Sequence, residues 1–239
     1  MKNTLFFLAL VLLFSLPVIA EISPNEIVKK ADFKRGLGTI SHSLNVSVTD
    51  QDNKKDVYHV SVKDSKSTLT EQMEPERARG RKMLMKEYDI WLFTPNIKKA
   101  VRISLEQKLT GEVSNGDVAT TNYAEDYEAK ILGLEKLNNI DTYHLELIAK
   151  NNKVTYRKIE YIVSQKDFTP MKATYFALSG KTLKIATFSD LKNIQGMTRV
   201  TKMIIQDYIQ KDKISTLIFS DHKPEKFNES FFNKEGLEF

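Results

Sequence analysis

The sequence predicts a mainly β protein: one antiparallel sheet of about eleven strands, curved or rolled into a barrel, with a few short helices. Segments of strand-like composition recur at short, steady spacing from Ile40 onward, and turn signals separate them. The 239 residues show no change in composition that would mark a linker. We therefore expect a single large all-β domain rather than two small ones.

The first twenty residues have the pattern of a secretory signal peptide. Lys2 provides the basic start, an apolar core runs from Leu5 to Leu16, and a cleavage pattern of small residues ends at Ala20. We expect a signal peptide at 1–20 and a mature domain at 21–239. The alternative is a signal anchor, but the run is short for a membrane span and Pro17 interrupts it.

Cysteine content and charge narrow the class of protein. The chain has no cysteine, which excludes an acylated lipoprotein and a disulfide scaffold. Its 36 basic and 31 acidic side chains give a net charge of +5. Because this weak excess is spread along the chain, it gives no argument for binding nucleic acid. The prediction is a soluble, exported protein.

The N-terminal part of the domain begins with a helix and continues with strands. Ser23 to Glu26 form a capping box with Pro at the first helical position, which predicts a short amphipathic helix to about Phe33. Gly36 ends it. Strict alternation of apolar and polar residues from Ile40 to Val48 predicts a half-buried strand, and Val57 to Lys63 returns as a second strand.

The stretch from Arg79 to Ile103 predicts a hairpin. Two short apolar runs, Met83–Met85 and Ile90–Phe93, flank a polar turn. In the second run Trp91 and Phe93 share one face while Ile90 and Leu92 share the other, because successive side chains point to opposite sides of a strand. Such a strand must be covered on both faces. One face can join an ordinary core, and the other needs a helix, a lid, a partner or an apolar ligand.

The second half of the chain reads as a meander. Residues 104–121 are poor in apolar residues and predict a long surface loop. A short helical segment near Phe227 to Phe232 is expected to cap an open edge of the sheet. Between them we expect seven strands, at about Asp126–Leu132, Thr142–Ala149, Val154–Val163, Met171–Leu178, Leu183–Phe188, Met197–Gln206 and Ile214–Phe219.

Catalytic motifs are absent from the sequence. It has no Cys nucleophile, no G-x-S-x-G, no glycine-rich phosphate loop and no H-E-x-x-H. The carboxylates of Glu125, Asp126 and Glu128 are interpreted as a solvated face rather than an acid/base pair. A zinc site could still assemble in space from residues that are distant in sequence, but isolated histidines are more often simply hydrogen-bonded. We therefore expect a binding protein, not an enzyme, with no cofactor and no metal; its four histidines are His42, His59, His144 and His222.

Positive charge is concentrated ahead of the hairpin, in Arg77, Arg79, Arg81 and Lys82. These residues are interpreted as one strand. Their charge would suit lipid head groups or an acidic patch of a partner, but an edge strand protected by charge is the favoured interpretation.

Several segments together resemble a known family. RGRKMLM (79–85), DIWLFTPNIKKAVRI (89–103), the segment from Tyr156 to Gly196 and TRVTKMIIQD (198–207) are similar to the exported LolA-like, outer-membrane lipoprotein-sorting proteins, relatives of the carriers LolA and LolB. The resemblance implies a half-open (incomplete) β-barrel with a helical lid and an apolar concavity for acyl chains. Moving a chain of roughly sixteen carbons through water costs on the order of 12 kcal/mol, so a soluble carrier must enclose it.

The resemblance implies a periplasmic carrier that binds acyl chains of lipids or lipoproteins and exchanges them with an inner-membrane transporter complex. The alternatives are an envelope lipid sensor or regulatory module, and a hydrolase with an unrecognised site. On the Trp91 strand, we expect the side that carries the aromatic pair to line the cavity. The full set of candidate cavity residues is Leu44, Val46, Met83, Met85, Trp91, Phe93, Ile159, Tyr161, Met203 and Ile205.

Overall fold

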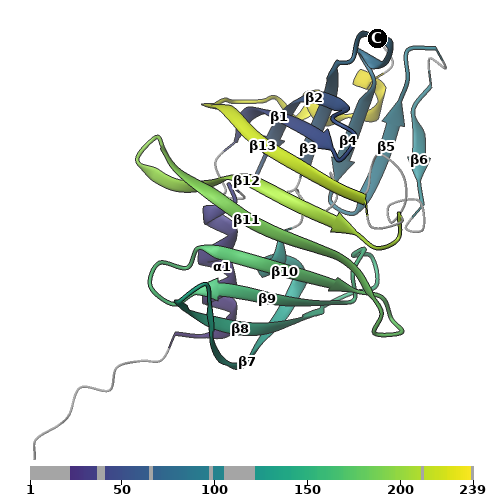
Figure 1. Cartoon of the computed structure of the whole chain (residues 1–239). Helices are drawn as coiled ribbons and strands as arrows, with labels where there is room; N and C mark the ends of the chain where they lie inside the picture. The colour runs from purple at the N-terminus through teal and green to yellow at the C-terminus, as the bar shows by residue number, and fades with distance from the viewer. Residues whose placement is uncertain are drawn as a thin grey trace, which may run out of the picture.

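The computed structural model describes residues 22–36, 41–64, 67–96, 99–104, 122–210 and 213–237. The expected signal peptide at 1–20 and almost all of the expected loop at 104–121 lie outside these residues. Within them, thirteen strands form one antiparallel sheet in the order β6-β5-β4-β3-β2-β1-β13-β12-β11-β10-β9-β8-β7 (Figure 1). Because β6 and β7 are its two edges, the sheet is open and the barrel is incomplete, as expected.

The strands are β1 (His42–Asp50), β2 (Lys55–Lys63), β3 (Ser67–Glu74), β4 (Lys82–Lys86), β5 (Asp89–Phe93), β6 (Val101–Ile103), β7 (Tyr127–Leu137), β8 (Ile140–Ala149), β9 (Lys158–Ser164), β10 (Pro170–Phe176), β11 (Thr182–Ile194), β12 (Met197–Asp207) and β13 (Lys213–Pro224). The helices are α1 (Pro24–Lys34) and α4 (Tyr123–Asp126), with 3-10 turns η1 (Glu76–Ala78), η2 (Glu229–Phe232) and η3 (Lys234–Leu237). The sequence predicted eleven of the thirteen strands. It missed β3, which is mostly polar, and β6, which has three residues.

Helix α1 starts where the capping box predicts. The Ser23 hydroxyl accepts a hydrogen bond from the Glu26 backbone N–H at 3.3 Å, and Pro24 occupies the first turn. Ile27, Val28 and Ala31 are fully buried in the main hydrophobic core. The helix contacts β7, β10 and β12, so it lies against the inner face of the curved sheet (Figure 1).

The strand register defines this inner face, which we call the concave face. Leu44 pairs with Val60 across β1 and β2, and the same row continues through Thr70 to Met83 and Leu92 on β5. On the other side of β1, the neighbouring row links Val48 of β1 to residues of β13, β12 and β11: Leu217, Met203 and Phe188. A largely apolar face, interrupted by polar residues such as Thr70 on β3, therefore runs across the sheet and meets α1.

The opposite face, which we call the convex face, carries a second and smaller core on β3 to β5. Leu84 and Phe93 are buried there against Phe232 and Leu237, with Trp91 packed beside them. The C-terminal segment thus covers a face of the sheet and does not cap an edge as expected. An ion pair between Lys63 and Glu229 adds a polar contact to the same packing.

Tyr88, in the turn between β4 and β5, links two distant parts of the sheet. Its hydroxyl donates to Asp126 of α4 at 3.1 Å and accepts from the Asn151 amide at 3.1 Å. Since β4 and β5 lie near one edge of the sheet while Asn151 follows β8 near the other, these contacts show how far the sheet curls. Burial is the main cause that raises the pKa of Tyr88.

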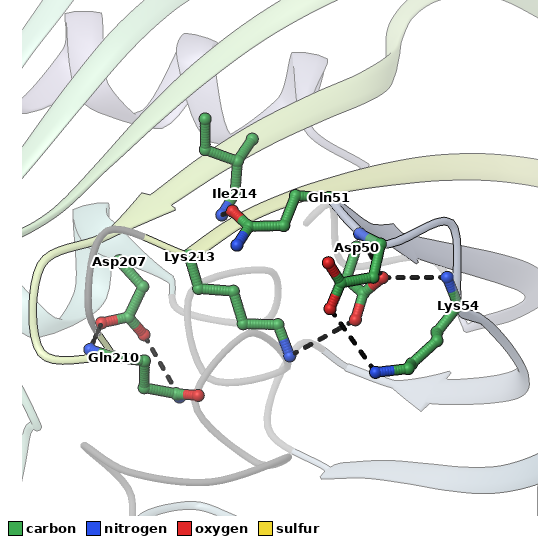
Figure 2. A network of polar contacts seen from close by, with 8 residues as sticks. Asp50, Gln51, Lys54, Asp207, Gln210, Lys213 and Ile214 are labelled. Atoms are coloured by element: carbon green, nitrogen blue, oxygen red, sulfur yellow. Dashed lines mark hydrogen bonds and ion pairs between the residues drawn. The ribbon is translucent and has the colours of Figure 1, made fainter.

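Polar contacts join the β1–β2 turn to the start of β13 (Figure 2). One Asp50 oxygen accepts from the backbone N–H groups of Asp52 and Lys54, both at 2.9 Å, and its other oxygen lies 3.9 Å from the Lys213 ammonium. The Gln51 side-chain oxygen accepts from the Ile214 N–H at 3.2 Å. The hydrogen bond from Lys54 is the main reason that the pKa of Asp50 is lowered.

The basic run before the hairpin is not one strand. Arg77 lies in η1, Gly80 turns the chain with a φ of 80°, and Lys82 begins β4. Arg79 donates to Glu76 within the same turn at 2.8 Å. The prediction of a charged edge strand was wrong because the turn separates these cations onto different elements.

Candidate functional site

The concave face of β1 to β6 is largely apolar except on β3, where it carries Thr68, Thr70 and Gln72, and it is only partly covered. Leu44 and Val60 are buried, whereas Met83 and Leu92 are partly exposed although they belong to the same row. Val101, which pairs with Leu92, is 50% exposed. This face of the sheet therefore offers apolar surface that the described part of the chain leaves accessible, and the methionines add flexible, polarizable side chains.

A small pocket opens where α1 ends against β11, β12 and β13, and four of its five lining side chains are apolar. Met203 is one of the predicted cavity residues that the structure brings to this pocket. The one charged group in the lining is the Arg35 guanidinium. The lining residues are Arg35, Phe188, Val200, Met203 and Phe219.

Arg35 is held by a buried acidic partner. Asp32 is 2% exposed, and one of its oxygens lies 3.2 Å from Arg35 Nη1 while the other accepts from the Ala124 N–H at 2.8 Å. Burial raises the pKa of Asp32 to about 6, although Arg35 and the Ala124 hydrogen bond favour the carboxylate. The guanidinium also lies over the Tyr123 ring, 4.2 Å from its centroid. These contacts tie α1 to α4 and fix the charged group beside the pocket.

Buried tyrosines pack around this ion pair. The Tyr123 ring meets Tyr161 edge to face at 5.1 Å, and the hydroxyls of Tyr123 and Tyr175 hydrogen-bond each other. Tyr156 packs against Tyr175 at a centroid distance of 4.7 Å. Burial raises the pKa of Tyr161 and of Tyr175 well above the ordinary value. The structure thus places Tyr161 of β9 and Tyr175 of β10 in the protein's own core.

Known structures show what this architecture is. A family model described only as an uncharacterized protein matches residues 64–239. The crystal structure of a LolA superfamily protein from Nitrosomonas europaea is 33% identical, covers 90% of this chain and 100% of its own, and superposes with a TM-score of 0.80. The chain belongs to the LolA superfamily. No match was found among curated proteins.

Two more distant structures share the LolA-like fold. A putative outer membrane lipoprotein-sorting protein domain from Vibrio parahaemolyticus is 22% identical, with a TM-score of 0.74, and covers 90% of this chain and 98% of its own. A DUF1329 family protein from Desulfovibrio piger is 20% identical, with a TM-score of 0.75, and covers 90% and 100%. At these identities the likeness supports the fold alone.

The LolA-like sheet separates the ten predicted cavity residues into two groups. Trp91 and Phe93 lie on the convex face, under the C-terminal segment, so the side of β5 expected to face the cavity is the wrong one. Ile90 and Leu92 occupy the concave face instead. The other eight residues share the concave face by register: Leu44, Val46, Met83, Met85, Ile159, Tyr161, Met203 and Ile205.

The concave residues differ in exposure. Ile159, Tyr161 and Ile205 are fully buried in the main core under α1 and α4. Met83 and Met85 are partly exposed on β4. The part of the face on β4 and β5 is therefore the best candidate for contact with a ligand, whereas the part on β9 and β12 belongs to the protein's own packing.

The other predicted polar features fall at different places. His144 lies near Glu135 and Glu160, at 3.5 and 3.7 Å, on the β8 surface. Asp126 binds the Tyr88 hydroxyl and Glu128 binds Asn25, so the acidic run serves structural contacts. Over the described ranges, no group of side chains is arranged to hold a metal ion, and no helix is long and apolar enough to cross a membrane.

Sequence reasoning missed the cations at the end of α1. Arg35 follows a predicted helix and Arg199 sits in a predicted strand, where basic residues are ordinarily solvated. Both are buried in the structure. The one usable signal was Gly36, since glycine at a helix end permits the close approach of a bulky neighbour.

Proposed function

We propose that this protein is a periplasmic carrier that encloses acyl chains of lipids or lipoproteins on its concave face and exchanges them with a membrane complex, without catalysis. The observation that carries the proposal is the row of apolar, partly exposed side chains on β4 and β5, such as Met83 and Leu92. Apolar surface on the inside of an open sheet is where a carrier can replace water around an acyl chain.

Membership of the LolA superfamily supports the proposal, and so does the shared fold of the putative lipoprotein-sorting domain from Vibrio parahaemolyticus. Export to the periplasm is supported by the signal-peptide pattern that ends at Ala20. The intact mass of the exported protein tests this part, because cleavage after Ala20 leaves a chain that starts at Glu21. Recovery of the uncleaved chain in the membrane fraction would contradict it.

Acyl binding is tested with the delipidated mature protein and a fluorescent fatty acid. Met83→Gln combined with Leu92→Gln places two amides on the concave face, and burying a polar group without a partner costs about 1 to 3 kcal/mol. We expect about 10-fold weaker binding or more. Lys82→Gln, on the convex side of the same strand, is the matched control and should bind like the wild type.

Two results would contradict these expectations, one for the binding surface and one for the carrier function. If the double variant melts like the wild type and binds the fatty acid with unchanged affinity, the concave face of β4 and β5 is not the binding surface. Failure of the wild type to bind any acyl probe, with no lipid found by mass spectrometry after purification, would contradict the carrier proposal itself.

A further inference from the structure

Arg199 on β12 is a buried cation that has no counter-charge among the residues that the structure describes. Its side chain lies beside the end of α1, and the residue is 7% exposed. Within the described part of the chain, Nη1 has no hydrogen-bond partner, and Nη2 contacts the Met197 sulfur at 3.9 Å. The Phe33 ring, 5.8 Å from the guanidinium carbon, adds a weak cation–π contact but no acceptor. A guanidinium stays charged, so this arrangement leaves strong donors unused.

Other buried cations in the described part of the chain are paired. Arg35 has Asp32 at 3.2 Å, and Lys184, which is fully buried, has Asp207 at 3.7 Å. No ion pair joins Arg199 to any carboxylate among the residues that the structure describes. Burial lowers the pKa of Arg199, as expected for a cation without an anionic neighbour. The contrast indicates a site whose counter-ion comes from outside the chain.

The backbone makes room for this guanidinium. Gly36 has a φ of +87°, and a Cβ built there would lie 3.0 Å from Arg199 Nη1. Any other residue would be strained at this φ and would press on the charged group. The turn after α1 is therefore shaped around the end of the Arg199 side chain.

His222 on β13 adds a second unused polar atom. Its Nε2 is buried and has no hydrogen-bond partner among the described residues, and its ring stacks on His42 at a centroid distance of 6.3 Å. Burial and the charge of Arg199 lower the pKa of His222 to about 4, so the imidazole is neutral at neutral pH. A neutral imidazole offers one N–H donor, which an anion beside Arg199 can use.

Arg199 shares a face of β12 with a residue of the small pocket. Residues 199, 201 and 203 lie on the same side of the strand, and Met203 lines that pocket together with Val200 and Phe219. Apolar side chains near a guanidinium and an imidazole match the two parts of an anionic amphiphile. Guanidinium groups bind carboxylate and phosphate oxygens with two parallel hydrogen bonds.

We propose that Arg199 and His222 bind the anionic group of the ligand, a carboxylate or phosphate ester, whose acyl chain lies on the concave face. This inference rests on the carrier function proposed above and names the class of ligand. It makes Arg199 a specificity determinant, because a neutral lipid of the same chain length would leave its charge unpaired.

The test compares palmitic acid with hexadecanol on the delipidated mature protein, since the two ligands differ only in the head group. The wild type should bind the acid about 10-fold or more tightly than the alcohol, the effect of a hydrogen bond to a charged group. Arg199→Met should abolish this preference and leave the affinity for the alcohol unchanged. Lys202→Met is the matched control: it removes one positive charge from the same strand, at a partly exposed side chain 3.9 Å from Asp190, and should keep the preference.

The outcomes separate the two proposals. Equal affinity of the wild type for the acid and the alcohol would overturn the anion site and leave the carrier intact. Binding of neither would overturn the carrier function. A third measurement uses inorganic phosphate. If phosphate alone binds as tightly as palmitic acid, the site holds a free anion and the assignment to a lipid is overturned.

A second measurement uses the wild type alone, so it does not depend on whether a variant folds. Palmitic acid, but not hexadecanol, should raise the pKa of His222 in the wild type, because the bound anion offsets the charge of Arg199. The other groups that act on His222 are His42 on β1 and Asp221 on its own strand. NMR titration of the imidazole measures the shift, and an unchanged pKa with the acid bound would contradict the proposal.

Discussion

At the scale of single residues, the end of α1 holds two buried arginines in different states. Arg35 is neutralised by Asp32, which also accepts from the Ala124 N–H. Arg199 has neither a carboxylate nor a complete set of acceptors among the described residues. The first arrangement fixes the helix on the sheet, and the second leaves donors for a ligand. Burial and pairing, rather than residue type, therefore distinguish a structural cation from a binding cation.

Asp32 makes the stability of the fold depend on pH. Burial raises its pKa from 3.8 to about 6, so its contribution is fully present below about pH 3.8 and is lost as the pH rises through 6. The Asp32→Asn variant cannot titrate at this position. Relative to it, the free energy of unfolding of the wild type should fall by on the order of 1 kcal/mol per pH unit between these two pH values. Chemical denaturation of both proteins at pH 4.5 and pH 7 measures the difference. If the free energy of unfolding of the wild type, relative to that of Asp32→Asn, is the same at both pH values or is higher at pH 7, the raised pKa is contradicted.

At the scale of elements, β5 explains why one strand can be apolar on both faces. The sequence showed that the strand Ile90–Phe93 is apolar on both faces, so both faces must be covered. The structure supplies the C-terminal segment on the convex side and leaves the concave side partly open. The sequence could not identify the convex cover, because contact between β5 and residues far along the chain leaves no local pattern.

The C-terminal segment should therefore contribute measurably to stability. Phe232 is 1% exposed in the convex core, whereas its neighbour Phe231 is 44% exposed. Phe232→Ala should cost about 3 to 5 kcal/mol. Phe231→Ala loses mainly ring contacts at the surface and should cost about 1 kcal/mol or less.

Denaturant unfolding, followed by the emission of Trp91 in the same core, measures both changes. Similar losses for the two variants would mean that the segment does not pack on β3 to β5 as described. A blue shift of Trp91 emission in folded Phe232→Ala would also argue against it, since opening this core admits water to the indole.

At the scale of the whole molecule, the sequence predicted the class of fold well. Alternation from Ile40 to Val48 specified both β1 and its buried face, since Leu44 and Val46 do lie in the core. Strand β3 was missed because its mostly polar residues carry no periodic signal. Its absence from the prediction did not alter the fold class, because neighbouring hairpins define an antiparallel sheet.

The candidate site was less predictable. Composition marks a strand as apolar, but which face becomes concave depends on the register across all thirteen strands. A register change of one residue would exchange Trp91 for Leu92. The site at Arg199 and His222 joins residues of different strands with the end of α1. Such a meeting of distant residues is set by the fold and has no signature in the linear sequence.

The central claim, that acyl chains bind on the concave face, is tested most directly by moving the single tryptophan by one position. The wild type carries Trp91 on the convex face; Trp91→Phe combined with Leu92→Trp carries the indole on the concave face. Both delipidated proteins are loaded with a brominated fatty acid, which quenches an indole in contact with it. We expect strong quenching of the relocated indole and little quenching of Trp91. Quenching of Trp91 alone, with both proteins folded and loaded, would contradict the account.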